Sequence, residues 1–260
     1  MASGMHSPPP GEAVGEAVGE AIGEAIGVAG TDVSAVASLD EPTRRRIYDY
    51  VGAQAAPVGR DDVAAALGVP RRTAAFHLDR LTEQGLLAVS FARRTGRSGP
   101  GAGRPAKFYQ RSAREVSVSL PPRHYDLAGS LLAGAMVQAQ QFGEPPREVL
   151  DRRARDFGEA MARERSGDRS GQQPGHGDTG VLMSLLEEYG FEPRLAAGDI
   201  VLHNCPFHAL AQEQAELVCG MSLHLLEGVL EGLGPTGLHA RLDPGLSRCC
   251  VRLEQAGSVR

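Results

Sequence analysis

The segment LGVPRRTAAFHLDRLTEQGLL, residues 67–87, constrains the fold of this chain most strongly, because its turn residues and its apolar spacing agree. Gly68-Val69 forms a turn, a helix is expected from Pro70 to Gln84, and Gly85 ends it. Apolar residues recur at helical spacing and predict one buried face. That face comprises Leu67, Val69, Ala74, Leu78 and Leu81.

The flanking residues extend this pattern on both sides. A helix is expected over Asp40–Gln54, opened by Asp40 or Glu41, and a short one over Arg60–Leu67. Residues 86–110 alternate as a β-hairpin with a tip rich in glycine and arginine. The order helix, short helix, turn, helix, hairpin predicts a winged helix-turn-helix over residues 38–116, which would bind double-stranded DNA.

Charge supports this prediction only when it is counted locally. The 260-residue chain has a formal net charge of −5, which alone argues against nucleic acid. Residues 40–115, however, hold 14 basic and 8 acidic residues, a net +6, whereas the remainder holds 13 and 24, a net −11. A basic module attached to an acidic domain is typical of a DNA-binding protein with a second function.

The expected DNA contacts lie on the face of the helix opposite the apolar stripe and on the wing. For His77, packing or a phosphate contact is favoured over a base contact, and Arg104 in Gly103-Arg104-Pro105 is suited to a minor groove. The simpler alternative is a solvated surface with no ligand. The candidates are Arg71, Arg72, Thr73, Phe76, His77 and Arg80 on the helix, and Arg93, Arg94, Arg97, Arg104 and Lys107 on the wing.

The N-terminal region contains a tetrapeptide repeat, GEAV or GEAI, over residues 11–26. Glycine at every fourth position disfavours an isolated helix, so residues 1–37 are expected to form a disordered tail, with an interaction helix as the alternative. No run of about 18 apolar residues and no secretory leader is recognisable, so a cytoplasmic protein without a membrane span is expected.

The C-terminal half, residues 123–256, is expected to be an α+β domain. A flexible loop is expected over residues 165–180, between the second and third helices. The predicted helices are Tyr125–Gln141, Pro146–Arg163, Val181–Tyr189 and Gln214–Leu233, and the predicted strands are Phe191–Leu195, Asp199–Leu202 and a last strand over Cys249–Leu253.

All four cysteines lie in the last 56 residues: Cys205, Cys219, Cys249 and Cys250. Cys205 and His208, in HNCPFH, have the two-residue gap of a metal knuckle. Thiolates with an imidazole suit zinc or an iron–sulfur cluster, and the spacing alone does not choose between them. For any single cysteine, the alternative is a small buried apolar residue.

Geometry adds two conditions to a shared site. An unbroken helix from residue 206 to Cys219 would separate Cys205 and Cys219 by about 20 Å, so the chain must break between about Ala209 and Glu213. On a strand, Cys249 and Cys250 would point to opposite faces, and the apolar parity of Val251 favours Cys249 as the inward residue unless a bulge inverts it.

Together these segments resemble the SufR-like branch of winged-helix regulators, the iron–sulfur-sensing repressors of the cluster-assembly operon. The likeness rests on residues 67–87, on GRPAKFY, on NCPFHALAQEQAELVCGMSLHLLEGVLEGLG and on SRCCVRLE. It implies a sensor domain in which Cys205, Cys219 and either Cys249 or Cys250 hold a 4Fe-4S or 2Fe-2S cluster, with His208 as the candidate fourth ligand.

The resulting hypothesis is a homodimeric repressor that reads an inverted-repeat operator and responds to its cluster, without enzymatic activity. Helix 125–141 is the expected dimer element, through Leu127, Leu131, Leu132 and Met136. One alternative is a zinc-stabilised DNA-binding regulator without redox sensing. Another, weaker alternative is an enzyme with Cys205 as nucleophile and His208 as base, for which no third orienting group is evident.

Overall fold

The computed structural model describes residues 29–92, 105–167, 179–245 and 248–256. The chain divides into two compact units, Val28–Val118 and Ser119–Arg260. The first unit begins upstream of the predicted start at residue 38, because Ala29–Ser38 forms helix α2 and its Ala35 is fully buried in the unit's core. The prediction of a disordered tail is therefore wrong for its last residues, and its repeat lies outside the described residues.

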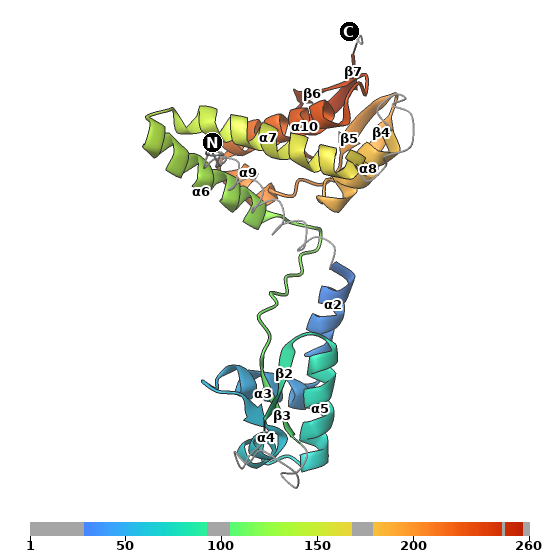
Figure 1. The fold of residues 1–260 in the computed structure, drawn as a ribbon. Helices are drawn as coiled ribbons and strands as arrows, with labels where there is room; N and C mark the ends of the chain where they lie inside the picture. Colours follow the sequence, from blue (N-terminus) through green and yellow to red (C-terminus); the bar gives the residue numbers. More distant parts are fainter. Residues whose placement is uncertain (1–28, 93–104, 168–178, 246–247, 257–260) are drawn as a thin grey trace, which may run out of the picture. The chain divides into compact units, whose positions relative to one another are not determined.

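The remaining helices of the first unit follow the predicted order (Figure 1). They are α3 (Pro42–Gly52), α4 (Arg60–Leu67) and α5 (Arg71–Glu83). Glu41 caps α3 by accepting hydrogen bonds from the backbone N–H groups of Thr43 (3.0 Å) and Arg44 (2.6 Å). Gly68 ends α4 in the left-handed conformation at φ +64°, which glycine adopts without steric cost.

A three-stranded antiparallel sheet completes the first unit. It consists of β1 (Val58–Gly59), β2 (Leu87–Ala92) and β3 (Ala106–Arg111), in the order β1-β3-β2. The β2–β3 pairing runs from Leu87 opposite Arg111 to Ala92 opposite Ala106, which is the predicted hairpin. The predicted apolar face of α5 is confirmed, since Ala74, Leu78 and Leu81 are fully buried.

Helices dominate the second unit. They are α6 (Tyr125–Phe142), α7 (Pro146–Gly167), α8 (Thr179–Glu188), α9 (His208–Glu213) and α10 (Ala215–Leu233). Helices α7 and α10 lie side by side (Figure 1), and their backbones are in direct contact. A Cβ atom placed on Gly158 of α7 would lie only 2.0 Å from the carbonyl oxygen of Leu225 on α10. Helix α7 extends beyond its predicted end at Arg163, and residues 168–178 of the expected loop lie outside the described residues.

A four-stranded antiparallel sheet, in the order β4-β5-β7-β6, completes the α+β unit. The strands are β4 (Pro193–Ala196), β5 (Asp199–Leu202), β6 (Leu238–Leu242) and β7 (Val251–Gln255). The prediction that the last strand begins at Cys249 is wrong, because β7 begins at Val251 and both cysteines precede it. The parity argument from strand alternation therefore does not apply to them.

Candidate nucleic-acid interface and thiol cluster

Helix α5 presents a polar and aromatic face on the side opposite its buried stripe. Arg71, Arg72 and Arg80 are exposed, and Phe76 projects between them with 63% of its surface accessible. Arg71 forms an ion pair with Asp61, but both side chains are well exposed, so little free energy is lost when Arg71 exchanges this partner for DNA.

His77 lies on a different side of α5 from these arginines. It is 7% exposed, and its ring nitrogens face Arg44 Nε (3.4 Å) and Glu41 Oε2 (3.5 Å). Burial lowers the pKa of His77, and the Glu41 carboxylate only partly opposes this effect. The side chain is thus a packing residue that joins α5 to the cap of α3, and in this arrangement it is not available for a base contact.

The wing is held against α5 through one carboxylate. Asp79 accepts hydrogen bonds from the buried Tyr109 hydroxyl (3.0 Å) and from Lys107 Nζ (2.7 Å), and burial together with this hydrogen bond raises the pKa of Tyr109. Lys107, a predicted DNA contact, therefore already has a partner, although it remains half-exposed. The other predicted wing contacts, Arg93, Arg94, Arg97 and Arg104, lie outside the described residues.

In the second unit, the four cysteines from three separate segments interact with one another. The Cys205 thiol lies near that of Cys249, the Cys249 thiol near that of Cys250, and the Cys250 thiol near that of Cys219, and each pair shifts its members' pKa in opposite directions. All four thiols are free, and Cys205 and Cys249 are buried in the core. The helix does break before Cys219, but at Gln214 and not within Ala209–Glu213, which belongs to α9; the break places Cys219 in the second turn of α10.

These pairs divide the thiols into two kinds. The neighbouring Cys249 thiol lowers the pKa of Cys205, and the same neighbour lowers the pKa of Cys250 to about 7. Burial, with the nearby Cys250 thiol, raises the pKa of Cys219 to about 12, and the Cys205 thiol raises that of Cys249. The pKa is therefore lowered for the Cys205 and Cys250 thiols and raised for the Cys219 and Cys249 thiols, which remain protonated at neutral pH.

His208, the predicted fourth ligand, is exposed at the first position of α9. Its backbone N–H donates to the Cys205 carbonyl oxygen (3.1 Å), whereas no contact of its imidazole with a thiol is seen in the described parts of the chain. Within those parts, no three His, Cys, Asp or Glu side chains are grouped as a metal site. The donor set of four thiols nevertheless fits a thiolate-bound metal or cluster, since thiolates are the usual ligands of both.

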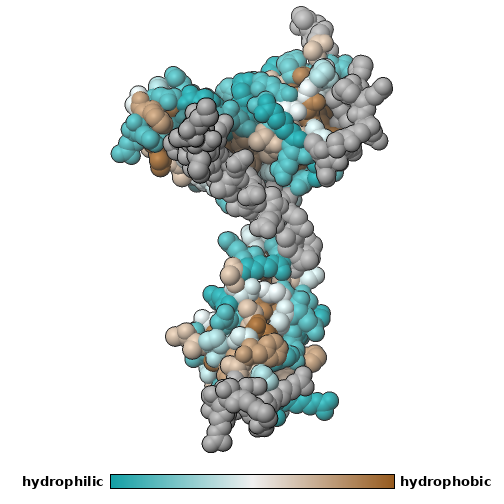
Figure 2. Space-filling view, in the orientation of Figure 1, coloured by the Kyte–Doolittle hydropathy of each residue, from teal (hydrophilic) through white to brown (hydrophobic). Residues whose placement is uncertain are grey.

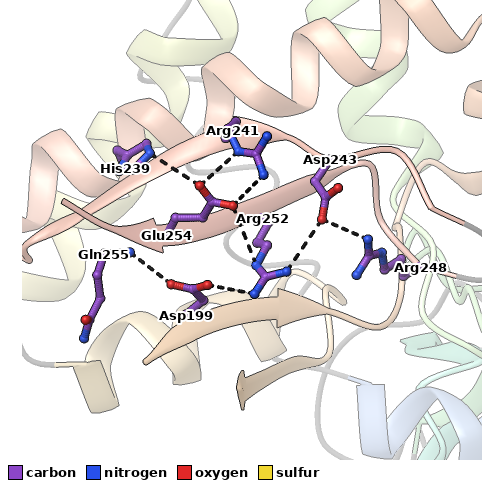
Figure 3. A network of polar contacts seen from close by, with 8 residues as sticks. All are labelled: Asp199, His239, Arg241, Asp243, Arg248, Arg252, Glu254 and Gln255. Carbon is purple, nitrogen blue, oxygen red and sulfur yellow. Dashed lines mark hydrogen bonds and ion pairs between the residues drawn. The ribbon is translucent and has the colours of Figure 1, made fainter. Parts of the chain in front are cut away.

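An ion-pair network that the sequence did not predict spans β5, β6 and β7 (Figure 3). Arg252 on β7 bridges Asp199 (2.7 Å) and Asp243 (3.7 Å), and Asp243 also pairs with Arg248 (2.8 Å). The backbone N–H of Asp243 donates to the Cys250 carbonyl oxygen (2.7 Å). These contacts fix the backbone of the cysteine pair to the edge of the sheet. Its signal in the sequence is the mixture of both charges along residues 241–254, which hold Arg241, Asp243, Arg248, Arg252 and Glu254.

Comparison with known proteins identifies one part of the chain. Residues 39–90 match the family described as "Helix-turn-helix domain". No curated protein and no solved structure matches the chain. The first unit therefore contains a helix-turn-helix domain, which indicates a DNA-binding transcriptional regulator and a non-enzymatic role. Among the described residues, no helix combines the length and the apolar character that are needed to cross a membrane.

Proposed function

We propose that this protein is a homodimeric, cytoplasmic transcriptional repressor whose operator affinity is controlled by an iron–sulfur cluster bound to its C-terminal thiols. The proposal is supported by the mutual influence of Cys205, Cys219, Cys249 and Cys250 on one another's pKa, in a chain that also contains a helix-turn-helix domain. The four thiols come from three segments that are close together only in the folded unit. Binding of a ligand to them therefore depends on the folded conformation and can alter it.

On the DNA side, the exposed face of α5 enters the major groove. The guanidinium groups of Arg71 and Arg72, at the N-terminal end of α5, are placed to read guanine or bind phosphate. Phe76 supplies an apolar surface for thymine methyl groups. Asp79 keeps the wing in register with α5 through Tyr109, so that wing and helix approach the duplex as one body.

Two copies would read an inverted repeat whose half-sites are about one helical turn apart. Of the predicted dimer residues on α6, Leu127 and Leu131 are buried within the unit and cannot contact a second copy. Met136, Val137 and Phe142, all in the C-terminal half of α6, are 59%, 66% and 62% exposed. Figure 2 shows apolar surface at the end where α6 and α7 meet, so this end of α6 is the better candidate for the interface.

The four thiols would hold the cluster, and when bound the cluster supplies sensitivity to oxidants and to iron supply. The chain's own part is to fix the ligands: the break at Gln214 positions Cys219, and the Arg252 network positions Cys249 and Cys250. The same four thiols also form a donor set suited to zinc, so a zinc-stabilised regulator without redox sensing is the second candidate.

Anaerobic purification followed by visible absorbance and iron and zinc analysis separates these two candidates. We expect iron, sulfide and a broad visible absorbance, all lost in Cys205→Ser and retained in Ser222→Ala, a buried control on α10. Operator affinity is then measured before and after iron removal. Zinc alone at one equivalent per chain would reject the cluster, and an affinity that does not respond to iron removal would reject its regulatory role.

A further inference from the structure

The chain passes from the first unit to the second through residues 119–124, and the end of this segment is attached to the turn that carries Cys205. Asn204, which is 7% exposed, makes the central contacts. Its side-chain amide donates to the carbonyl oxygens of Pro122 (3.0 Å) and Gly190 (2.6 Å), and its oxygen accepts from Arg123. Every polar atom of this buried side chain is therefore used to hold the segment.

Arg123 extends the attachment to the cysteine itself. Its Nη1 donates to the Cys205 carbonyl oxygen (3.0 Å) as well as to Asn204. The next residue, His124, donates its backbone N–H to the Pro206 carbonyl oxygen (3.0 Å), and the Tyr125 hydroxyl accepts from the N–H of Ala209 (3.3 Å). Four successive residues, 122–125, thus contact the turn formed by residues 204–209.

This arrangement has a mechanical consequence. Buried polar groups are costly to leave unpaired, so a displacement of the Asn204-Cys205-Pro206 backbone must either move residues 122–124 with it or break several hydrogen bonds at once. Cys205 is a proposed ligand, and residue 119 follows directly after Val118, the last residue of the first unit. Direct hydrogen bonds therefore join the connecting segment to the backbone that carries the Cys205 thiol.

We infer that Asn204 and Arg123 are positioning residues that transmit the state of the thiol cluster to residues 119–124, and through them to the DNA-binding unit. The inference rests on the proposed function for the identity of the signal. It assigns the transmission to a defined set of hydrogen bonds between the Cys205 turn and the connecting segment. Arg123 acts through the Cys205 backbone and does not itself bind the cluster.

The backbone amide of His124 is the direct reporter, because its hydrogen bond to Pro206 closes this attachment. We would measure its hydrogen exchange, by mass spectrometry with residue-level fragmentation, in metal-free protein and in protein loaded anaerobically with ferrous iron and sulfide. In the wild type we expect the exchange rate to differ between the two states. In Arg123→Ala it should be fast in both, with the loaded absorbance retained. Arg163→Ala, an exposed arginine of α7, should behave as the wild type.

Operator affinity is measured on the same samples. We expect loading to change wild-type affinity by about 5- to 150-fold, the usual range of allosteric coupling, and Arg123→Ala to reduce that ratio to within about twofold of unity. If Arg123→Ala does not fold, Arg123→Lys replaces it, because lysine keeps the charge but lacks the planar guanidinium that donates to both Asn204 and the Cys205 carbonyl oxygen. In this variant we expect a smaller decrease in the ratio of loaded to metal-free operator affinity.

The outcomes separate the two proposals. Identical His124 exchange in loaded and metal-free wild type, with loading shown by absorbance, would overturn the inference, as would an Arg123→Ala protein that keeps the full affinity ratio. If His124 exchange responds to loading while operator affinity does not, the link between thiols and segment stands and the proposed regulatory function fails.

Discussion

The pKa of each of the four thiols depends on its neighbouring cysteines as well as on its burial. Cys249 and Cys250 are adjacent in sequence, yet the pKa of one is raised and that of the other is lowered to about 7. The protonated Cys249 can donate its single S–H to Cys205 or to Cys250, and either bond stabilises the accepting thiolate. Because thiolates are the forms that bind metal and react with electrophiles, Cys250 and Cys205 are expected to be the first to engage either.

This division predicts the alkylation pattern of the metal-free protein. With a pKa of about 7, Cys250 should react with iodoacetamide about tenfold faster at pH 8 than at pH 6, because its thiolate fraction rises by that factor. Cys219, with a pKa of about 12, should remain the slowest of the partly exposed thiols. Peptide mass spectrometry after timed quenching measures both rates. Preferential labelling of Cys219 would contradict the assignment of proton donors.

His77 gives a second prediction at the level of a single residue. Its pKa is lowered in the folded state by burial, so the unfolded chain binds a proton more readily between that lowered value and 6.5. The stability of the first unit should therefore be complete above pH 6.5 and decline as the pH falls toward the folded pKa. Urea unfolding followed by circular dichroism at pH 5.5 and 7.5 tests this, with His77→Gln expected to reduce the difference. An unchanged difference in that variant would place the titration elsewhere.

Among the elements, the pair α7 and α10 depends on glycines that let two backbones meet. A Cβ on Gly228 would lie 1.9 Å from the Arg155 carbonyl oxygen, and backbone atoms cannot move aside as a flexible side chain can. Around the same crossing, the Arg155 side chain forms ion pairs with Glu227 and with Glu231 (2.5 Å) on α10. Packing and polar contacts therefore fix the same register between the helices.

Gly228→Ala should destabilise the second unit by about 1–3 kcal/mol, the usual cost of overpacking, despite the better helix propensity of alanine. Gly129→Ala on α6 is the matched control, because nothing lies within 4 Å of its Cβ position and alanine should stabilise the helix by up to about 1 kcal/mol. Thermal unfolding midpoints of the two variants should shift in opposite directions. Equal shifts would mean that the close crossing of α7 and α10 is not what holds the unit together.

Elements defined by local signals were predicted well, and elements defined by distant partners were not. Arg60–Leu67 and Asp199–Leu202 have the predicted bounds, because glycines at 68 and 198 mark one end of each. Strand β1 has two residues and exists through its pairing with β3, which no local pattern records. Likewise, the need for a break before Cys219 followed from helix geometry, whereas the bond from Asn204 to Pro122 joins residues 82 positions apart and left no trace in the sequence.

For the whole molecule, the separation of charge along the chain matters more than its sum. Residues 40–115 carry +6 within a chain of −5, so attraction to DNA must come from the first unit while the rest of the chain opposes non-specific association. This division predicts a steep dependence of operator affinity on salt that originates in the arginines of one unit. It also predicts that removing arginines elsewhere has little effect.

The test combines Arg71→Ala with Arg72→Ala and follows binding to an operator and to random duplex DNA between 50 and 200 mM salt. Loss of two base contacts should weaken operator binding by about 30- to 10,000-fold and leave the salt slope nearly unchanged. Loss of two phosphate contacts should instead weaken both duplexes equally and reduce the slope by about 0.9 for each contact. Arg163→Ala, in the acidic part of the chain, should alter neither quantity. If the double variant binds both duplexes as the wild type does across this range, the exposed face of α5 is not the surface that meets DNA.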